Sequence, residues 1–171
     1  MEKYIFNLLF SLLFISFCNA QNIVVLEKNN SKELIGKGIG SFDAFLLDSS
    51  KVNIESIRSK YILICFWSSS CELCHEELQI LSKLQQIYHK RGLKIIAYSI
   101  DTSTTEINEN ISDSINNLSF WWSTSSNTMK LITELNIYKI PYFILLDKKN
   151  KIIGIMDNRE KLLSVLNEKI K

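Results

Sequence analysis

Two continuous apolar runs, Tyr61–Trp67 and 93–100, constrain the fold of this chain more than any other feature. A run without polar alternation is typical of a strand that is buried on both faces of a sheet. Between the runs, apolar residues recur at helical spacing, namely Leu78, Leu81, Leu84 and Tyr88. Gly92 then ends the predicted helix. A strand, a helix and a strand with short connections predict a right-handed βαβ unit with parallel strands.

The rest of the chain predicts further elements around this unit. Expected strands cover residues 42–47, 52–54, 118–122, 142–147 and 151–156, the first two and the last two as antiparallel hairpins. Expected helices cover residues 101–117, 128–135 and 159–170. Within 101–117, Ser103 and Glu106 match a capping box, and isoleucines follow at every fourth position. Asn136 suits a left-handed helix C-cap.

Composition excludes several classes of protein. The chain has 171 residues, of which 46% are hydrophobic, so it is neither disordered nor of low complexity. Its 20 Lys and Arg against 18 Asp and Glu leave a formal charge of only +2. We therefore expect no nucleic acid as partner, and we expect a monomer.

The first twenty residues resemble a secretory signal peptide. Lys3 precedes an apolar run over 8–17, and small residues end the segment at Cys18-Asn19-Ala20. We expect residues 1–20 to be the signal peptide and residues 21–171 to be one α/β domain, which is exported. An uncleaved anchor and a lipid attached to Cys18 are the alternatives.

The cysteines of the mature chain indicate redox chemistry. Cys65, Cys71 and Cys74 are an odd number, which excludes a framework of structural disulfides. Cys71 and Cys74 fall where the buried strand turns into its helix, and the helix N-terminus lowers the pKa of a thiol there. We expect Cys71 to be the exposed nucleophile and Cys74 the shielded resolving thiol of a Cys71–Cys74 redox disulfide. Cys65 is expected to be a buried, inert thiol.

Residues 66–77 (FWSSSCELCHEE), with the Ile140-Pro141 pair that follows them, resemble the active-site segments of thioredoxin-like proteins. Within that superfamily the chain resembles the secreted TlpA/ResA-like thiol-disulfide oxidoreductases, over about residues 35–171. The resemblance implies a thioredoxin-like fold: a central mixed β-sheet flanked by helices, with an N-terminal β-hairpin and a central helical insertion. Ser70 stands where many relatives have Trp, and Leu73 where many have Pro.

The resemblance also implies a function. It implies an exported protein-disulfide reductase of the periplasm or cell envelope, with no cofactor and no metal. Its partners would be exported client proteins with disulfides, including apocytochrome c during cytochrome c maturation, and a membrane thiol donor for re-reduction. The direction of the reaction stays open at this point, because an oxidising compartment also permits an oxidase.

Five residues around the couple are given roles by the resemblance or by their charge. Pro141 is expected in the cis form, with the backbone of Ile140 pairing a substrate chain; a trans proline that starts a strand is the alternative. Glu77 would assist proton transfer, or else be a solvated surface carboxylate. Glu72 would make the dithiol a better reductant by raising the thiol pKa. Trp67 would exclude water from one side of the cysteines or line the substrate site, or else be a core residue.

Three rival interpretations use the same residues. Cys71-x-x-Cys74-His75 is also the attachment motif of c-type haem, for which Met129 or Met156 would supply a second axial ligand. A thiol peroxidase of the peroxiredoxin kind shares the scaffold, but its Thr/Pro-rich motif is missing. A zinc site would lack a fourth ligand.

Overall fold

The computed structural model describes residues 32–109 and 111–171. The predicted signal peptide, residues 1–20, lies outside the described residues, and so does Cys18. No helix within the described part of the chain combines the length and the apolar character needed to cross a membrane.

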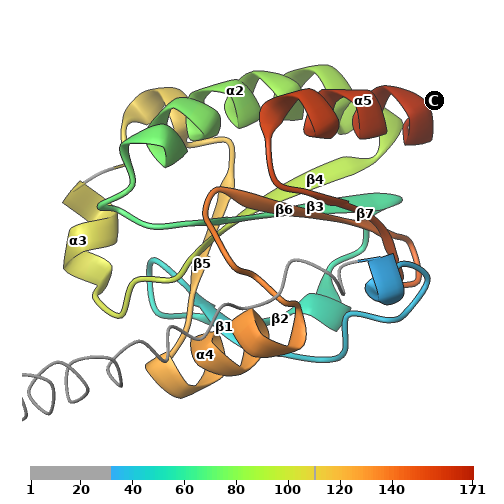
Figure 1. The fold of residues 1–171 in the computed structure, drawn as a ribbon. Helices are drawn as coiled ribbons and strands as arrows, with labels where there is room; N and C mark the ends of the chain where they lie inside the picture. The colour runs from blue at the N-terminus through green and yellow to red at the C-terminus, as the bar shows by residue number, and fades with distance from the viewer. Residues whose placement is uncertain (1–31, 110) are drawn as a thin grey trace, which may run out of the picture.

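Seven strands form one mixed sheet with the order β2-β1-β5-β4-β3-β6-β7 (Figure 1). They are β1 (Asp43–Leu46), β2 (Lys51–Asn53), β3 (Tyr61–Trp67), β4 (Leu93–Ser99), β5 (Ser119–Trp122), β6 (Tyr142–Asp147) and β7 (Ile152–Met156). β3, β4 and β5 are parallel neighbours, whereas β6 runs antiparallel to β3. The β1–β2 and β6–β7 hairpins are antiparallel, as predicted.

Helices cover both faces of this sheet (Figure 1). They are α2 (Glu72–Tyr88), α3 (Thr104–Glu109), α4 (Ser125–Glu134) and α5 (Arg159–Lys169), with short 3-10 helices η2 (Ile54–Ser56), η3 (His89–Arg91) and η4 (Asp113–Ile115). α2 and α5 lie side by side on one face, and α4 lies on the other. The predicted βαβ unit is β3–α2–β4, so the predicted fold class is confirmed.

Two hydrophobic clusters explain why β3 is apolar at every position. Leu63, Cys65 and Trp67 point to the face covered by α2 and α5. The alternate residues Ile62, Ile64 and Phe66 point to the face covered by α4. Successive side chains of a strand face opposite sides of the sheet, so a strand with helices on both sides needs apolar residues throughout.

The predicted helix over residues 101–117 is wrong in its extent. α3 ends at Glu109, and Asp113–Ile115 forms a separate turn of 3-10 helix. Ser, Asn and Asp dominate this stretch, and their side chains compete with helical hydrogen bonds. Ser114 instead donates to Gln79 Oε1 at 2.9 Å, which ties the segment to α2.

Helix α4 also differs from its predicted boundaries. It begins at Ser125 rather than at residue 128, because Thr124 has the extended backbone of an N-cap residue. Its C-terminal end agrees with the prediction, since Asn136 adopts a positive φ of 52°.

Candidate active site

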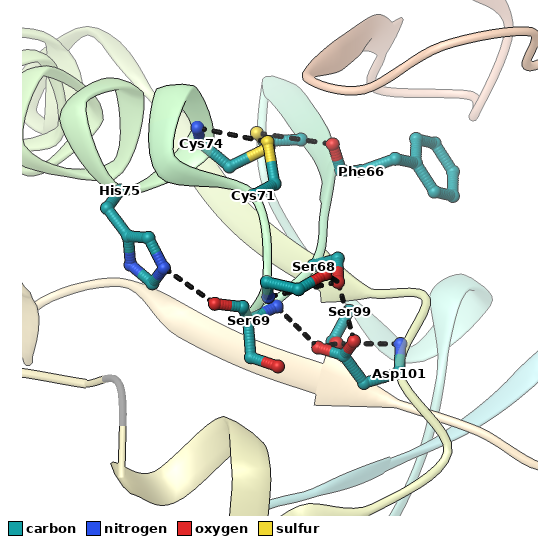
Figure 2. The surroundings of a disulfide bond; sticks show 10 residues. Phe66, Ser68, Ser69, Cys71, Cys74, His75, Ser99 and Asp101 are labelled. Carbon is teal, nitrogen blue, oxygen red and sulfur yellow. Dashed lines mark hydrogen bonds between the residues drawn. A yellow bond between two sulfur atoms is a disulfide. The ribbon is translucent and has the colours of Figure 1, made fainter.

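Cys71 and Cys74 form a disulfide at the N-terminus of α2, and their Cα atoms are 5.2 Å apart (Figure 2). Cys71 is the N-cap residue of the helix, and its Sγ accepts the N–H of Cys74 at 3.2 Å. When the disulfide is reduced, this donor and the positive end of the helix dipole both favour a thiolate at Cys71. The local sequence therefore builds a site for an activated thiol.

The two sulfurs differ in access to solvent. Cys71 is half-buried, whereas Cys74 is fully buried under the first turn of α2. Between them, Leu73 is 56% exposed and presents an apolar surface beside the couple. An incoming disulfide can therefore reach Cys71 more readily than Cys74.

The carboxylate of Asp101 holds the loop that precedes Cys71 (Figure 2). Its Oδ1 accepts the hydroxyl of Ser68 at 2.7 Å, and its Oδ2 accepts the N–H of Ser69 at 2.7 Å. Ser99, at the end of β4, donates its hydroxyl to the same Oδ2 at 2.7 Å. Charge-assisted hydrogen bonds of this kind are stronger than neutral ones, so they fix the backbone from which Cys71 is presented.

We expect Asp101→Asn to weaken the fold and to reduce its sensitivity to acid. Burial raises the pKa of Asp101, but hydrogen bonds from Ser68, Ser69 and Ser99 outweigh it and hold the pKa below its ordinary value. A carboxyl with a depressed folded pKa contributes stability that is present above its unfolded pKa and is lost as the pH falls through the folded pKa. Wild type should thus lose this contribution to stability below about pH 4. At neutral pH, the Asp101→Asn substitution should lower the free energy of unfolding by about 1–2 kcal/mol.

Urea unfolding of both proteins between about pH 2 and pH 7 measures this difference. The difference in unfolding free energy between wild type and Asp101→Asn should become smaller as the pH falls. A gap that is constant over the whole range would contradict the assigned role of the Asp101 charge.

His75 connects the first turn of α2 to the same loop. Its Nε2 lies 2.8 Å from the carbonyl oxygen of Ser69 (Figure 2). The imidazole also meets Trp67 edge to face, with ring centroids 6.0 Å apart. His75 therefore braces the loop against the helix.

Trp67 lies behind the couple rather than on its surface. The indole is fully buried and packs edge to face against Phe120, with centroids 5.9 Å apart. Its Nε1 has no hydrogen-bond partner among the described residues. This placement favours the core interpretation of Trp67, with exclusion of water from the couple, over direct contact with a substrate.

Glu77 is buried in α2, three residues after Cys74. Only 5% of the residue is exposed, which rules out the solvated-surface interpretation. Arg159, at the start of α5, donates from Nε to Glu77 Oε1 at 2.9 Å, and its Nη2 lies 2.9 Å from the same oxygen. The other oxygen, Oε2, is buried without a hydrogen-bond partner in the described part of the chain.

Cys65 is a buried free thiol on β3. Burial raises the pKa of this thiol, and the nearby charge of Glu77 raises it further. A thiol of raised pKa is a poor nucleophile at neutral pH, which agrees with the predicted inert role.

The remaining predicted site residues lie around the same end of the sheet. The Ile140–Pro141 peptide bond is cis, as the resemblance predicted. Tyr142 pairs with Phe66, so Pro141 lies beside the end of β3 that leads to Cys71. Ile140 is half-buried, and Glu72 is exposed in the first turn of α2.

Sequence reasoning missed Asp101 and Arg159. Asp101 follows directly on a predicted parallel strand, and the carboxyl ends of neighbouring parallel strands share one edge of a sheet. That signal could have placed it near Cys71. Arg159 had no comparable signal, since it lies 82 residues from Glu77.

Within residues 32–109 and 111–171, no group of three or more His, Cys, Asp or Glu side chains is placed to hold a metal ion.

The fold and the site together define a class of protein. A βαβ unit with a bonded Cys-x-x-Cys pair at the helix N-terminus, and a cis proline at the start of the neighbouring strand β6, is the arrangement of a thioredoxin-fold redox protein. The cysteine pair is its reactive centre.

Comparison with known proteins identifies the family. The model of a thioredoxin-like family matches residues 59–152. The thiol-disulfide oxidoreductase ResA of Bacillus cereus (strain ZK / E33L) is 26% identical over 125 residues, which cover 73% of this chain and 70% of that protein. ResA of Bacillus thuringiensis subsp. konkukian (strain 97-27) is 23% identical over 83% of this chain and 82% of its own.

Solved structures show the same fold. The thioredoxin domain of a thiol-disulfide oxidoreductase from Bacteroides vulgatus superposes with a TM-score of 0.73 at 19% identity, covering 80% of this chain and 98% of that one. A putative thiol:disulfide interchange protein DsbE from Chlorobium tepidum gives a TM-score of 0.69 at 15% identity, with the same coverage. The chain therefore belongs to the thioredoxin-like family, and it is a thiol-disulfide oxidoreductase similar to ResA.

Proposed function

We propose that the protein is an exported protein-disulfide reductase that uses the Cys71–Cys74 couple. The observation that carries this proposal is the unequal exposure of the two cysteines at the N-terminus of α2: Cys71 is half-buried and caps the helix, and Cys74 is fully buried. This asymmetry suits a nucleophile and a resolving thiol.

The reaction has two exchange steps. The Cys71 thiolate attacks one sulfur of a client disulfide, which forms a mixed disulfide and releases the other client sulfur as a thiolate. Cys74 then loses its proton and attacks Cys71, so that the Cys71–Cys74 bond forms and the client leaves with both cysteines reduced. The client gains two electrons, and the couple is oxidised by two.

Glu77 is proposed as the group that accepts the proton from Cys74. Both residues are buried on α2, and a spacing of three places them on the same face of the helix. A buried thiol needs a nearby base because water has little access to it.

The couple must be re-reduced after each cycle. An oxidising compartment cannot supply the two electrons, so a membrane thiol donor is the proposed partner. The proposed location is the periplasm or cell envelope, reached through the signal peptide predicted at residues 1–20. Exported proteins with disulfides, apocytochrome c among them, are the proposed clients.

The reduction potential of the couple tests the proposed direction. We expect a value near that of thioredoxin, about −270 mV, when the protein without residues 1–20 is equilibrated against dithiothreitol. Cys65→Ala is the matched control: it removes the third thiol and should leave the measured potential unchanged. A potential near −120 mV would instead indicate an oxidase and contradict the proposal.

The haem interpretation is less well supported by the geometry. Met156 is buried in the core and Met129 is exposed on α4, on the face of the sheet opposite α2. The Nε2 of His75 is engaged with Ser69. Binding haem at Cys71 and Cys74 would require these contacts to be broken. No feature of the described residues favours a peroxidase over disulfide exchange.

A further inference from the structure

The ion pair between Glu77 and Arg159 is unusual in its geometry. Two of the three guanidinium nitrogens, Nε and Nη2, approach the same carboxylate oxygen, Oε1, at 2.9 Å. The second oxygen is left buried without a partner among the described residues. A bidentate pair would occupy both oxygens. Here the arginine orients the carboxylate and leaves one oxygen free.

Arg159 is not placed where it would stabilise its own helix. It is the first residue of α5, where the positive end of the helix dipole disfavours a cation. The helix is already capped by Asn158, whose Oδ1 accepts the N–H of Lys161 at 2.9 Å. We therefore infer that the Arg159 side chain stabilises Glu77 rather than α5.

Among the described residues, Arg159 is the one cation that forms an ion pair with Glu77. From α5 it faces Arg159, and from β3 it faces the buried thiol of Cys65. On α2 its neighbours are Cys74 and Glu76, and Glu76 Oε2 lies 3.9 Å from Arg159 Nη2. A carboxylate at this depth depends on its partner, because an unpaired buried charge is strongly destabilising.

We propose that Arg159 is the positioning residue of the proton-transfer step. It holds Oε1 of Glu77 and leaves Oε2 to receive the proton of Cys74. This inference rests on the proposed function, because it assigns a partner to the residue that deprotonates the resolving thiol.

In the mixed disulfide, the Cys74 proton passes to Oε2 of Glu77, and the Cys74 sulfur attacks the Cys71 sulfur. The Cys71–Cys74 bond forms, the bond from Cys71 to the client sulfur breaks, and the client departs as a thiolate. Glu77 afterwards returns its proton to solvent. Arg159 keeps its charge throughout.

Stopped-flow reaction of the reduced protein with 5,5′-dithiobis(2-nitrobenzoate) separates the two exchange steps. Attack by Cys71 releases one equivalent of thionitrobenzoate, and resolution by Cys74 releases a second equivalent in a later phase. The pH dependence of each phase is measured in wild type and in Arg159→Gln, Arg159→Lys, Glu77→Gln and Lys161→Gln.

We expect Arg159→Gln to slow the second phase about tenfold at neutral pH and to raise its pH midpoint by about one unit, while the first phase is unchanged. Arg159→Lys restores the cation and should recover most of the rate. Lys161→Gln removes a cation from the same helix, one that pairs with Asp157 instead, and should behave as wild type.

A double variant shows whether Arg159 acts through Glu77. Added to Glu77→Gln, the Arg159→Gln change should cause no further shift in pH midpoint. An unshifted second phase in folded Arg159→Gln, or an equal shift in Lys161→Gln, would overturn the inference. If Arg159→Gln does not fold, the test uses Arg159→Lys instead. A second phase in Arg159→Lys that is as slow as in Glu77→Gln would then overturn the inference. Failure of the proposed function looks different: the Cys71–Cys74 couple of wild type would then have the reduction potential of an oxidase, whatever the two phases show.

Discussion

Cys74→Ser is expected to accumulate as a mixed disulfide between Cys71 and client proteins, whereas Cys71→Ser should accumulate none. Cys71 is the more exposed of the two cysteines, and its thiolate is favoured by the α2 N-terminus, so we expect it to make the first attack. Without the resolving thiol, the mixed disulfide has no internal route of release. Turnover in an insulin-reduction assay should fall to the reagent background in both variants.

Non-reducing gel electrophoresis of the two variants, followed by mass spectrometry of the adducts, measures the trapping. The Cys65→Ala substitution in each background is the control, because it removes the third thiol from the described residues. Equal trapping by Cys71→Ser and Cys74→Ser would reverse the assignment of nucleophile, and trapping through Cys65 would contradict its inert role.

Trp67→Ala is expected to lower the free energy of unfolding by about 3–5 kcal/mol. The indole is fully buried at the end of β3, between His75 and Phe120, so truncation leaves a large cavity. The same cavity removes the support of His75, whose Nε2 bonds to Ser69. We therefore expect slower attack by Cys71 as well as lower stability.

Trp67→Phe is the matched control for this prediction. It keeps most of the apolar volume, and it loses no hydrogen bond, because the indole Nε1 has no partner in the part of the chain that the structure describes. Its cost should be much smaller than that of Trp67→Ala in urea unfolding. Equal costs for the two variants would show that cavity formation is not the cause.

Local patterns in the sequence determined most of the fold. β3 is a continuous apolar run because it is buried on both faces, and the leucines of α2 recur at helical spacing because the helix is buried on one face. Both patterns can be recognised in a short window of residues. The same window contains Cys71, Cys74 and the strand-to-helix turn. For this reason the cysteine pair could be predicted without coordinates, whereas its order of attack stays a prediction.

The insertion after β4 shows where local patterns mislead. Ile107, Ile111 and Ile115 are spaced as in a helix, yet α3 ends at Glu109. The serines of this segment bond to α2, and such contacts between distant parts of the chain outweigh a weak helical preference.

Only the tertiary structure decided the environment of the couple. A spacing of three from Cys74 puts Glu77 on a helix face, but whether that face meets solvent or α5 depends on how the two helices pack. Arg159 reaches Glu77 from 82 residues away, and Asp101 reaches Ser68 from the neighbouring strand. Hydrogen bonds and ion pairs of this range follow from the packing of whole elements, because no local preference of the chain brings their partners together.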